Sequence, residues 1–173
     1  MTVKIIGICL ILCSSTAIGF ECSSRLKERI GELESIRKLL LMLRGEIKYS
    51  HSTLSEAFYT IGKRLKSSYG VFLLKAAEEM DSMEGQTLAQ IWENCVNGEL
   101  KESALKKEDK EKLIHLGSQL GYLDTEMQIS TIELYLEQVQ EEIKNATENF
   151  KRNGKLYRTL GVMAGIFLVI LMI

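Results

Sequence analysis

An uncharged run near the C-terminal end of the sequence most constrains what the chain can fold into. Residues 156–173 read LYRTLGVMAGIFLVILMI, and no charged residue follows Arg158. A run of about 18 apolar residues is long enough for a membrane-spanning helix, which satisfies its own backbone groups in hydrocarbon. The residues just before the run and at its start include four basic ones (Lys151, Arg152, Lys155 and Arg158). Such residues mark the cytoplasmic end of a span. The alternative, a buried core helix, needs a partner surface on every side.

A second apolar stretch, VKIIGICLILCSSTAIGF, covers residues 3–20 and has two interpretations. A cleaved signal peptide needs a basic start, a short apolar core and a small-residue cleavage site, and residues 14–17 could supply that site. A retained membrane helix is favoured by Arg25, Lys27 and Arg29, since positive charge after the run keeps the following segment in the cytoplasm. We therefore expect transmembrane helices at 1–22 and 154–173 and a cytoplasmic domain at 23–153.

Both expected spans carry small residues four positions apart. Ser15 and Gly19 form one pair, and Gly161 and Gly165 form the other. Small residues at this spacing allow two helix backbones to approach closely in lipid. Gly161 and Gly165 are therefore candidate helix-contact residues in the membrane, although glycine is common in membrane helices for other reasons as well.

The composition predicts an all-α fold, with a helical-bundle domain between the two spans. The 173 residues include no proline and 26% charged residues. A net charge of -1 gives no reason to expect nucleic acid as a partner. Leu33, Ile36, Leu40 and Leu43 follow the three-and-four spacing of an amphipathic helix within residues 28–49.

Helix boundaries can be expected from local motifs. Thr53 with Glu56, and Thr87 with Gln90, have the spacing of capping boxes at helix starts. The similar segments TLSEAF and TLAQIW that they open are either a weak internal repeat or a chance similarity. We expect residues 67–70 to break a helix and residues 97–98 to end the next one.

The later part of the domain is expected to be a charged surface followed by a long helix. Residues 100–112 read as a solvated loop or helix start, without a site. Asp124 is placed to cap a helix of about 30 residues that leads towards the second span. Residues 153–154 are the one weak point in that helix, because glycine costs about 1 kcal/mol in a helix interior.

No catalytic, cofactor or metal site is expected, so the sequence does not favour an enzyme. His51 and His115 have no ligand neighbour at helical spacing, and no phosphate-binding glycine loop is present. The four cysteines form no CxxC pair and do not suggest a disulfide framework. They are Cys9, Cys13, Cys22 and Cys95.

Several stretches resemble the stage III sporulation protein AB family. They are SSTAIGF at 14–20, RLKER at 25–29, LSEAF at 54–58, LGYLDTEMQISTIELYLEQ at 120–138 and KLYRTLGVMAGIFLVILMI at 155–173. The family pattern L-G-x-x-D-x-x-x-Q is carried here by Leu120, Gly121, Asp124 and Gln128, to which we assign structural roles. The chain departs from the pattern at Leu123 and Thr125, and at Gly154.

The resemblance implies a function that the residues alone do not. Family members are membrane proteins of endospore-forming bacteria, and their cytosolic domain is similar to the type II secretion inner-membrane F protein domains. The expected role is a platform or adaptor subunit of a secretion-like channel complex between mother cell and forespore. The implied partners are the secretion-ATPase-like sporulation protein AA, other membrane subunits of the complex, the lipid bilayer and further copies of the chain. The implied location is the mother-cell membrane. The alternative is a secreted or membrane-anchored helical protein with a cleaved leader and a structural role.

Overall fold

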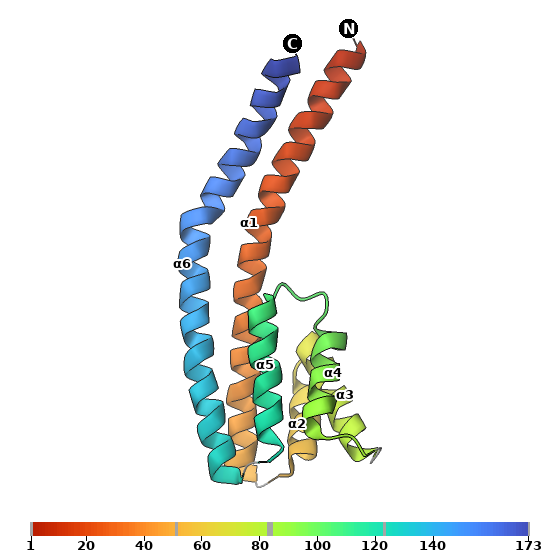
Figure 1. Cartoon of the computed structure of the whole chain (residues 1–173), viewed down its shortest axis with the longest axis vertical. Helices are drawn as coiled ribbons and strands as arrows, with labels where there is room; N and C mark the ends of the chain where they lie inside the picture. Colours follow the sequence, from red (N-terminus) through yellow and green to blue (C-terminus); the bar gives the residue numbers. More distant parts are fainter. Residues whose placement is uncertain (1, 51, 83–84, 123, 173) are drawn as a thin grey trace. The chain divides into compact units, whose positions relative to one another are not determined.

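The computed structural model describes residues 2–50, 52–82, 85–122 and 124–172, and it is helical in all its regular elements (Figure 1). The expected all-α fold is therefore confirmed. The elements in chain order are α1 (Thr2–Gly45), the π-helical turn η1 (Glu46–Ser50), α2 (Leu54–Arg64), α3 (Ser68–Asp81), α4 (Leu88–Glu99), α5 (Lys107–Leu120) and α6 (Thr125–Met172).

The chain forms two compact units. Unit 1 combines Met1–Gly31 with Lys144–Ile173, and unit 2 is Glu32–Ile143. Helices α1 and α6 run through both units, so the division falls inside two continuous helices. These positions differ from the limits at 22/23 and 153/154 that the polarity of the sequence suggested.

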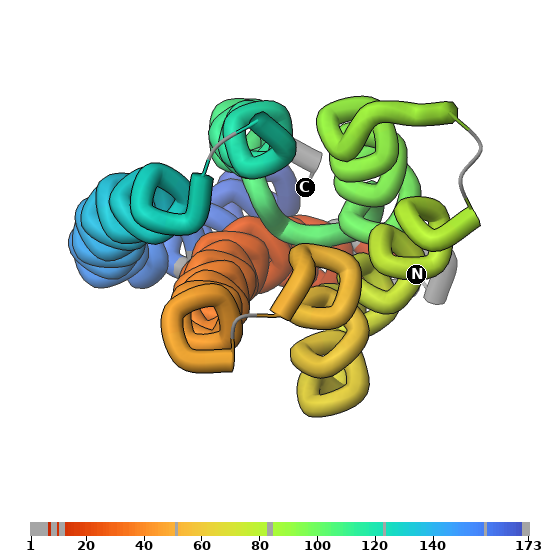
Figure 2. Tube along the Cα trace, turned by 90° about the horizontal axis from the view of Figure 1, so that it is seen from below, coloured from red at the N-terminus to blue at the C-terminus, as the bar shows by residue number. Residues whose placement is uncertain are grey.

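Unit 2 is a helical bundle with Trp92 in its core. The Trp92 side chain is fully buried and packs against Phe58 of α2 and Phe72 of α3, with ring centroids 5.3 and 4.7 Å away. Its indole nitrogen donates a hydrogen bond of 2.8 Å to the carbonyl oxygen of Leu113 in α5. Figure 2 shows α5 between α4 and the first part of α6 within this unit. Trp92 thus joins α2, α3, α4 and α5.

The expected helix starts in unit 2 are confirmed. At α2, Glu56 N–H donates to Thr53 Oγ1 and the Glu56 carboxylate accepts from the Thr53 N–H. At α4, Thr87 and Gln90 form the same reciprocal pair. These contacts depend on residues three apart, which explains why the sequence alone predicts them.

Of two expected helix ends, one is wrong and one is confirmed. Helix α4 continues through Gly98 to Glu99, and the capping residue is Leu100. The expected break near residues 67–70 is confirmed, since α2 ends at Arg64 and α3 begins at Ser68. Gly70 itself lies in the first turn of α3, where a Cβ would come within 1.9 Å of the Leu65 carbonyl oxygen. Glycine at position 70 therefore permits a close backbone approach between α2 and α3.

The charged segment 100–112 contains buried residues and a capped helix start, so it is not only a solvated surface. Its helical part begins at Lys107, and Asp109 is buried with 4% of its surface exposed. The Asp109 carboxylate accepts a hydrogen bond of 2.9 Å from the Lys106 N–H and so caps α5. Leu105, in the same segment, is also buried.

Unit 1 consists of the first part of α1 and the last part of α6. Among the residues that the structure describes, no helix combines the length and apolarity needed to cross a membrane. The two expected spans are therefore not confirmed. Parts of them, namely most side chains of residues 1–12 and those of 158 and 171–173, lie outside the described side chains.

Candidate functional site

The motif residues form a hydrogen-bonded corner between α5 and α6. The Asp124 carboxylate accepts a 2.9 Å hydrogen bond from the Met127 N–H, which caps α6 as expected. The side-chain amide of Gln128 donates a hydrogen bond of 2.9 Å to the carbonyl oxygen of Leu120, the last residue of α5. Asp124 therefore starts α6, and Gln128 holds that start against the end of α5.

Gly121 supports this corner because its missing side chain leaves space for Leu88 of α4. It follows the last residue of α5 and has an ordinary right-handed backbone, with φ of -72°. A Cβ at this position would lie 3.2 Å from the Cβ of Leu88 in α4. Leu120, on the other side of the helix end, is fully buried. The corner thus packs on α4.

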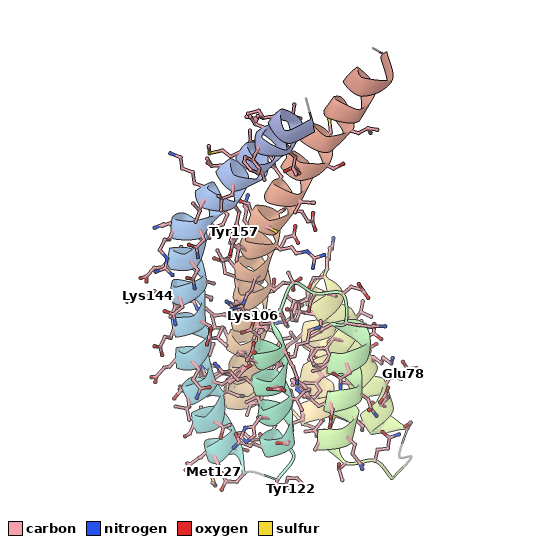
Figure 3. All side chains as sticks on the ribbon, turned by 45° about the horizontal axis from the view of Figure 1, so that its top comes forward. Glu78, Lys106, Tyr122, Met127, Lys144 and Tyr157 are labelled. Carbon is pink, nitrogen blue, oxygen red and sulfur yellow. The ribbon has the colours of Figure 1, made fainter. Side chains whose placement is uncertain are left out.

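A shallow groove next to the corner is open to solvent. Figure 3 labels Tyr122 and Met127 at the same end of unit 2, and 76% and 54% of their surfaces are exposed. Gln119 and Thr131 continue the groove along α5 and α6. Its lining residues are Lys112, His115, Leu116, Ser118, Gln119, Tyr122, Met127, Ser130, Thr131, Leu134, Tyr135 and Gln138. Among these there is no carboxylate, and we call this feature the α5–α6 groove.

A buried polar cluster in unit 2 was not foreseen from the sequence. Tyr69, Tyr135 and Asp109 are all buried, although they come from α3, α6 and α5. Burial is the main cause that raises the pKa of the Tyr69 hydroxyl, and the nearby carboxylate of Glu32 is the second. The hydroxyl does not form a hydrogen bond of normal geometry with Glu32. Burial, and then Asp109, raises the pKa of Tyr135. Tyr69 and Tyr135 are therefore neutral hydroxyls that lie near carboxylates.

In unit 1 the small residues bring α1 and α6 into backbone contact. A Cβ on Gly19 would lie 2.7 Å from the Tyr157 carbonyl oxygen, and a Cβ on Gly161 would lie 2.9 Å from the Ser15 carbonyl oxygen. The Ser15 hydroxyl donates a hydrogen bond to the carbonyl oxygen of Gly161. Gly165, the other candidate residue, is buried.

The sequence analysis missed one pair in this contact. Ser23 is buried, and its Oγ would lie 3.4 Å from a Cβ on Gly154. Gly154 sits inside the continuous helix α6, so it is a contact position and does not interrupt the helix. Ser15, Gly19 and Ser23 are spaced by four, so extending this spacing by one step would have identified Ser23, whereas Gly154 lies seven residues before Gly161 and outside such a series.

The whole chain was compared with known proteins. Residues 4–173 match the family model described as stage III sporulation protein AB. The chain belongs to this family. A stage III sporulation protein AB from Bacillus subtilis (strain 168) is 28% identical over 170 residues, which cover 98% of each chain. A solved structure of a stage III sporulation protein AB is similar with a TM-score of 0.64 and 25% identity, covering 71% of this chain and 96% of that one.

Family membership gives the chain a role in sporulation. No group of three or more His, Cys, Asp or Glu side chains is placed to hold a metal ion within the described part of the chain. His115 lines the α5–α6 groove, and His51 lies outside the described residues. Cys13, Cys22 and Cys95 are free thiols, and the side chain of Cys9 is not described.

Proposed function

We propose that this sporulation protein is a membrane-anchored adaptor subunit of a secretion-like channel complex between mother cell and forespore. In this proposal unit 2 lies in the cytoplasm and docks a secretion-type ATPase, sporulation protein AA. Unit 1 anchors the chain in the mother-cell membrane. Membership of the stage III sporulation protein AB family supports the sporulation role.

Exposed apolar side chains in unit 1 support the membrane anchor. Leu160, Met163 and Phe167 of α6 expose 52%, 61% and 64% of their surfaces. Large apolar side chains exposed along one helix indicate contact with a partner protein or a membrane. On α1, Leu10 and Ile18 are exposed in the same way.

The contact between α1 and α6 supports a retained N-terminal helix. Cleavage of a leader after residues 14–17 would remove Ser15, whose hydroxyl bonds to Gly161. The alternative of a secreted protein with a cleaved leader would therefore leave Gly161 without this partner. Reporter fusions test the topology: a cytoplasmic-only reporter should be active after Ser55 and inactive after Ile173. Activity of an extracytoplasmic reporter at Ser55 would overturn it.

The α5–α6 groove is the observation that carries the docking proposal. Tyr122, Met127 and Leu134 are exposed apolar side chains of unit 2 that line one groove. Aromatic residues and methionine are enriched at the centres of protein interfaces, and a groove between two helices suits an apolar helix face or loop of a partner. The groove begins at the corner formed by the family motif residues, which holds its two walls together.

A partner must also supply the energy in this proposal, because we assign no enzymatic activity and no cofactor to the chain. The continuous helix α6 begins at the corner and extends 48 residues to Met172 in unit 1. It offers a physical connection between a docked ATPase and the membrane, although connection alone is no measure of coupling. Other membrane subunits and further copies of the chain are additional proposed partners, and nucleic acid is not.

Co-purification tests the docking. The full chain, solubilised in detergent, should recover the ATPase, and a variant that lacks residues 23–153 should not. Membrane localisation of both proteins is the control, because it shows that the variant is produced and inserted. Equal recovery of the ATPase with both proteins would contradict a docking role for the domain.

A further inference from the structure

The two units carry opposite charge, which the overall balance of -1 hides. Unit 1 contains nine Lys and Arg residues against three Asp and Glu residues, whereas unit 2 contains 13 against 20. Unit 1 has no acidic residue before Glu21 or after Glu148. The positive charge is therefore concentrated in the unit that also exposes apolar side chains.

The antiparallel contact within unit 1 brings basic residues of both helices to one level. Ser15 and Gly19 meet Gly161, and further along α1 Ser23 meets Gly154, so the two helices run in opposite directions. The same register places residues 24–27 of α1 beside residues 150–153 of α6. Lys27 therefore lies at the level of Lys151 and Arg152.

These cations are exposed and available. The side chains of Lys27, Lys151, Arg152 and Lys155 are all exposed. Within the described residues, Lys27, Lys151 and Lys155 form no ion pair, and Arg152 donates only to the side-chain oxygen of Asn149, at 3.2 Å. In contrast, Arg25 nearby is paired with Glu21 at 3.1 Å. We call the four cations Lys27, Lys151, Arg152 and Lys155 the basic collar.

The collar is followed along α6 by exposed apolar side chains. Leu156 and Leu160 are each 52% exposed and directly follow the collar along α6, and Tyr157 is 40% exposed between them. Phosphate groups lie directly outside the hydrocarbon of a bilayer, and basic residues next to an apolar helix attract anionic headgroups. An exposed tyrosine two residues after Lys155, among these apolar side chains, fits headgroup depth.

We propose that the basic collar binds anionic phospholipid headgroups. This inference rests on the proposed membrane anchor but goes beyond it, since an anchor alone needs only apolar contact. The lipid class is defined by its chemistry: a phosphodiester headgroup with net negative charge. Because exposed charges are screened by salt, the preference should weaken at high ionic strength.

Vesicle flotation with the full chain, diluted from detergent, tests the proposal. The vesicles contain phosphatidylcholine alone or phosphatidylcholine with phosphatidylglycerol. At low salt we expect at least about tenfold more protein to float with the phosphatidylglycerol vesicles, because each exposed basic residue near an anionic surface adds to the attraction. The triple variant Lys151→Gln, Arg152→Gln and Lys155→Gln should lose this preference. The matched control, Lys38→Gln, Lys66→Gln and Lys101→Gln, removes the same charge from exposed positions of unit 2 and should keep it.

The outcomes separate this proposal from the anchor on which it rests. Equal flotation with both kinds of vesicle would overturn the headgroup site and leave the anchor intact. No flotation with either kind would overturn both. Inorganic phosphate at the same charge concentration should compete weakly, and full competition by phosphate would mean a site for the free ion. Binding of an RNA oligonucleotide without any preference for phosphatidylglycerol would also overturn the proposal.

Discussion

Gly117 lies directly against Trp92, so that a Cβ at position 117 would come within 2.1 Å of the indole Cδ1 atom. Gly117 is in α5, four residues after Leu113, whose carbonyl oxygen accepts the indole hydrogen bond. Helix α5 therefore fixes the indole ring in two ways. The close packing requires glycine at position 117, and the carbonyl oxygen of Leu113 requires the indole N–H as its donor. This pair of contacts explains why α5 packs so closely on the core of unit 2.

Gly117→Ala should destabilise the protein. The added methyl group has no space beside the buried ring, and overpacking of a core typically costs about 1–3 kcal/mol. Gly98→Ala is the matched control, because Gly98 is also helical and only Lys75 Nζ lies as near as 4.0 Å. The control should stabilise α4 by up to about 1 kcal/mol. Urea unfolding followed by Trp92 fluorescence measures both, and equal effects would contradict the packing.

Trp92→Ala should be more damaging than either glycine change. The ring is fully buried between Phe58 and Phe72, and truncation of a buried aromatic side chain costs about 3–5 kcal/mol. The variant would be followed by far-ultraviolet circular dichroism, since it lacks the fluorescent probe. An unfolding midpoint close to that of the unaltered chain would show that Trp92 is not the centre of the core.

Helix caps could be predicted from the sequence, whereas tertiary contacts could not. Thr53, Thr87 and Asp124 were predicted as helix caps because each bonds to a backbone group three residues away. The position of Gly70 inside α3 and the continuation of α4 through Gly98 were not predicted, because a glycine has the same local signal whether it ends a helix or admits a neighbour. Only the fold distinguishes Gly70, which faces Leu65, from Gly98, which faces open space.

The candidate site likewise contains some residues that the sequence predicts and others that it does not. Gly161 was a candidate because its spacing from Gly165 repeats that of Ser15 and Gly19, and the structure brings Ser15, Gly19 and Gly161 together. The role of Asp109 could not be predicted, since its burial depends on helices that are distant in sequence. The α5–α6 groove is also a product of packing and has no local signature.

Stability should fall in alkaline solution. Burial raises the pKa of the Cys95 thiol to about 11, and it raises the pKa values of Tyr69 and Tyr135 as well. The unfolded chain loses these protons at about pH 8.5 for cysteine and about pH 10 for tyrosine, whereas the folded chain keeps them. Above these values the unfolded state binds fewer protons, so the free energy of unfolding decreases as pH rises.

Urea unfolding at pH 7, 9 and 10.5 measures this decrease. Tyr135→Phe should reduce the loss between pH 9 and 10.5, because it removes one proton that only the folded state retains. Tyr59→Phe, which removes a hydroxyl from a half-exposed ring, is the control and should leave the loss unchanged. The same pH dependence in all three proteins would show that Tyr135 does not contribute.

Gly161→Leu should separate α1 from α6 in unit 1. Even a Cβ at this position would lie 2.9 Å from the Ser15 carbonyl oxygen, so a larger side chain must push the helices apart. Pulsed electron paramagnetic resonance between labels on Cys22 and on a Lys155→Cys variant, in a chain without other cysteines, measures the separation. A longer and broader distance distribution is expected. Gly7→Leu is the control, since nothing lies within 4 Å of a Cβ at Gly7, and an equal change in both would refute a specific contact.

The affinity of the purified full chain for the purified ATPase tests the central claim most directly. The double variant Tyr122→Ser and Met127→Ser removes two exposed apolar side chains of the α5–α6 groove without touching the core. Tyr59→Ser with Val71→Ser removes side chains of similar exposure from α2 and α3. We expect the groove variant to raise the Kd by about tenfold or more, as for residues central to an interface, and the control to leave it unchanged. An unchanged Kd in the groove variant, or no binding by the unaltered chain, would contradict docking through this groove.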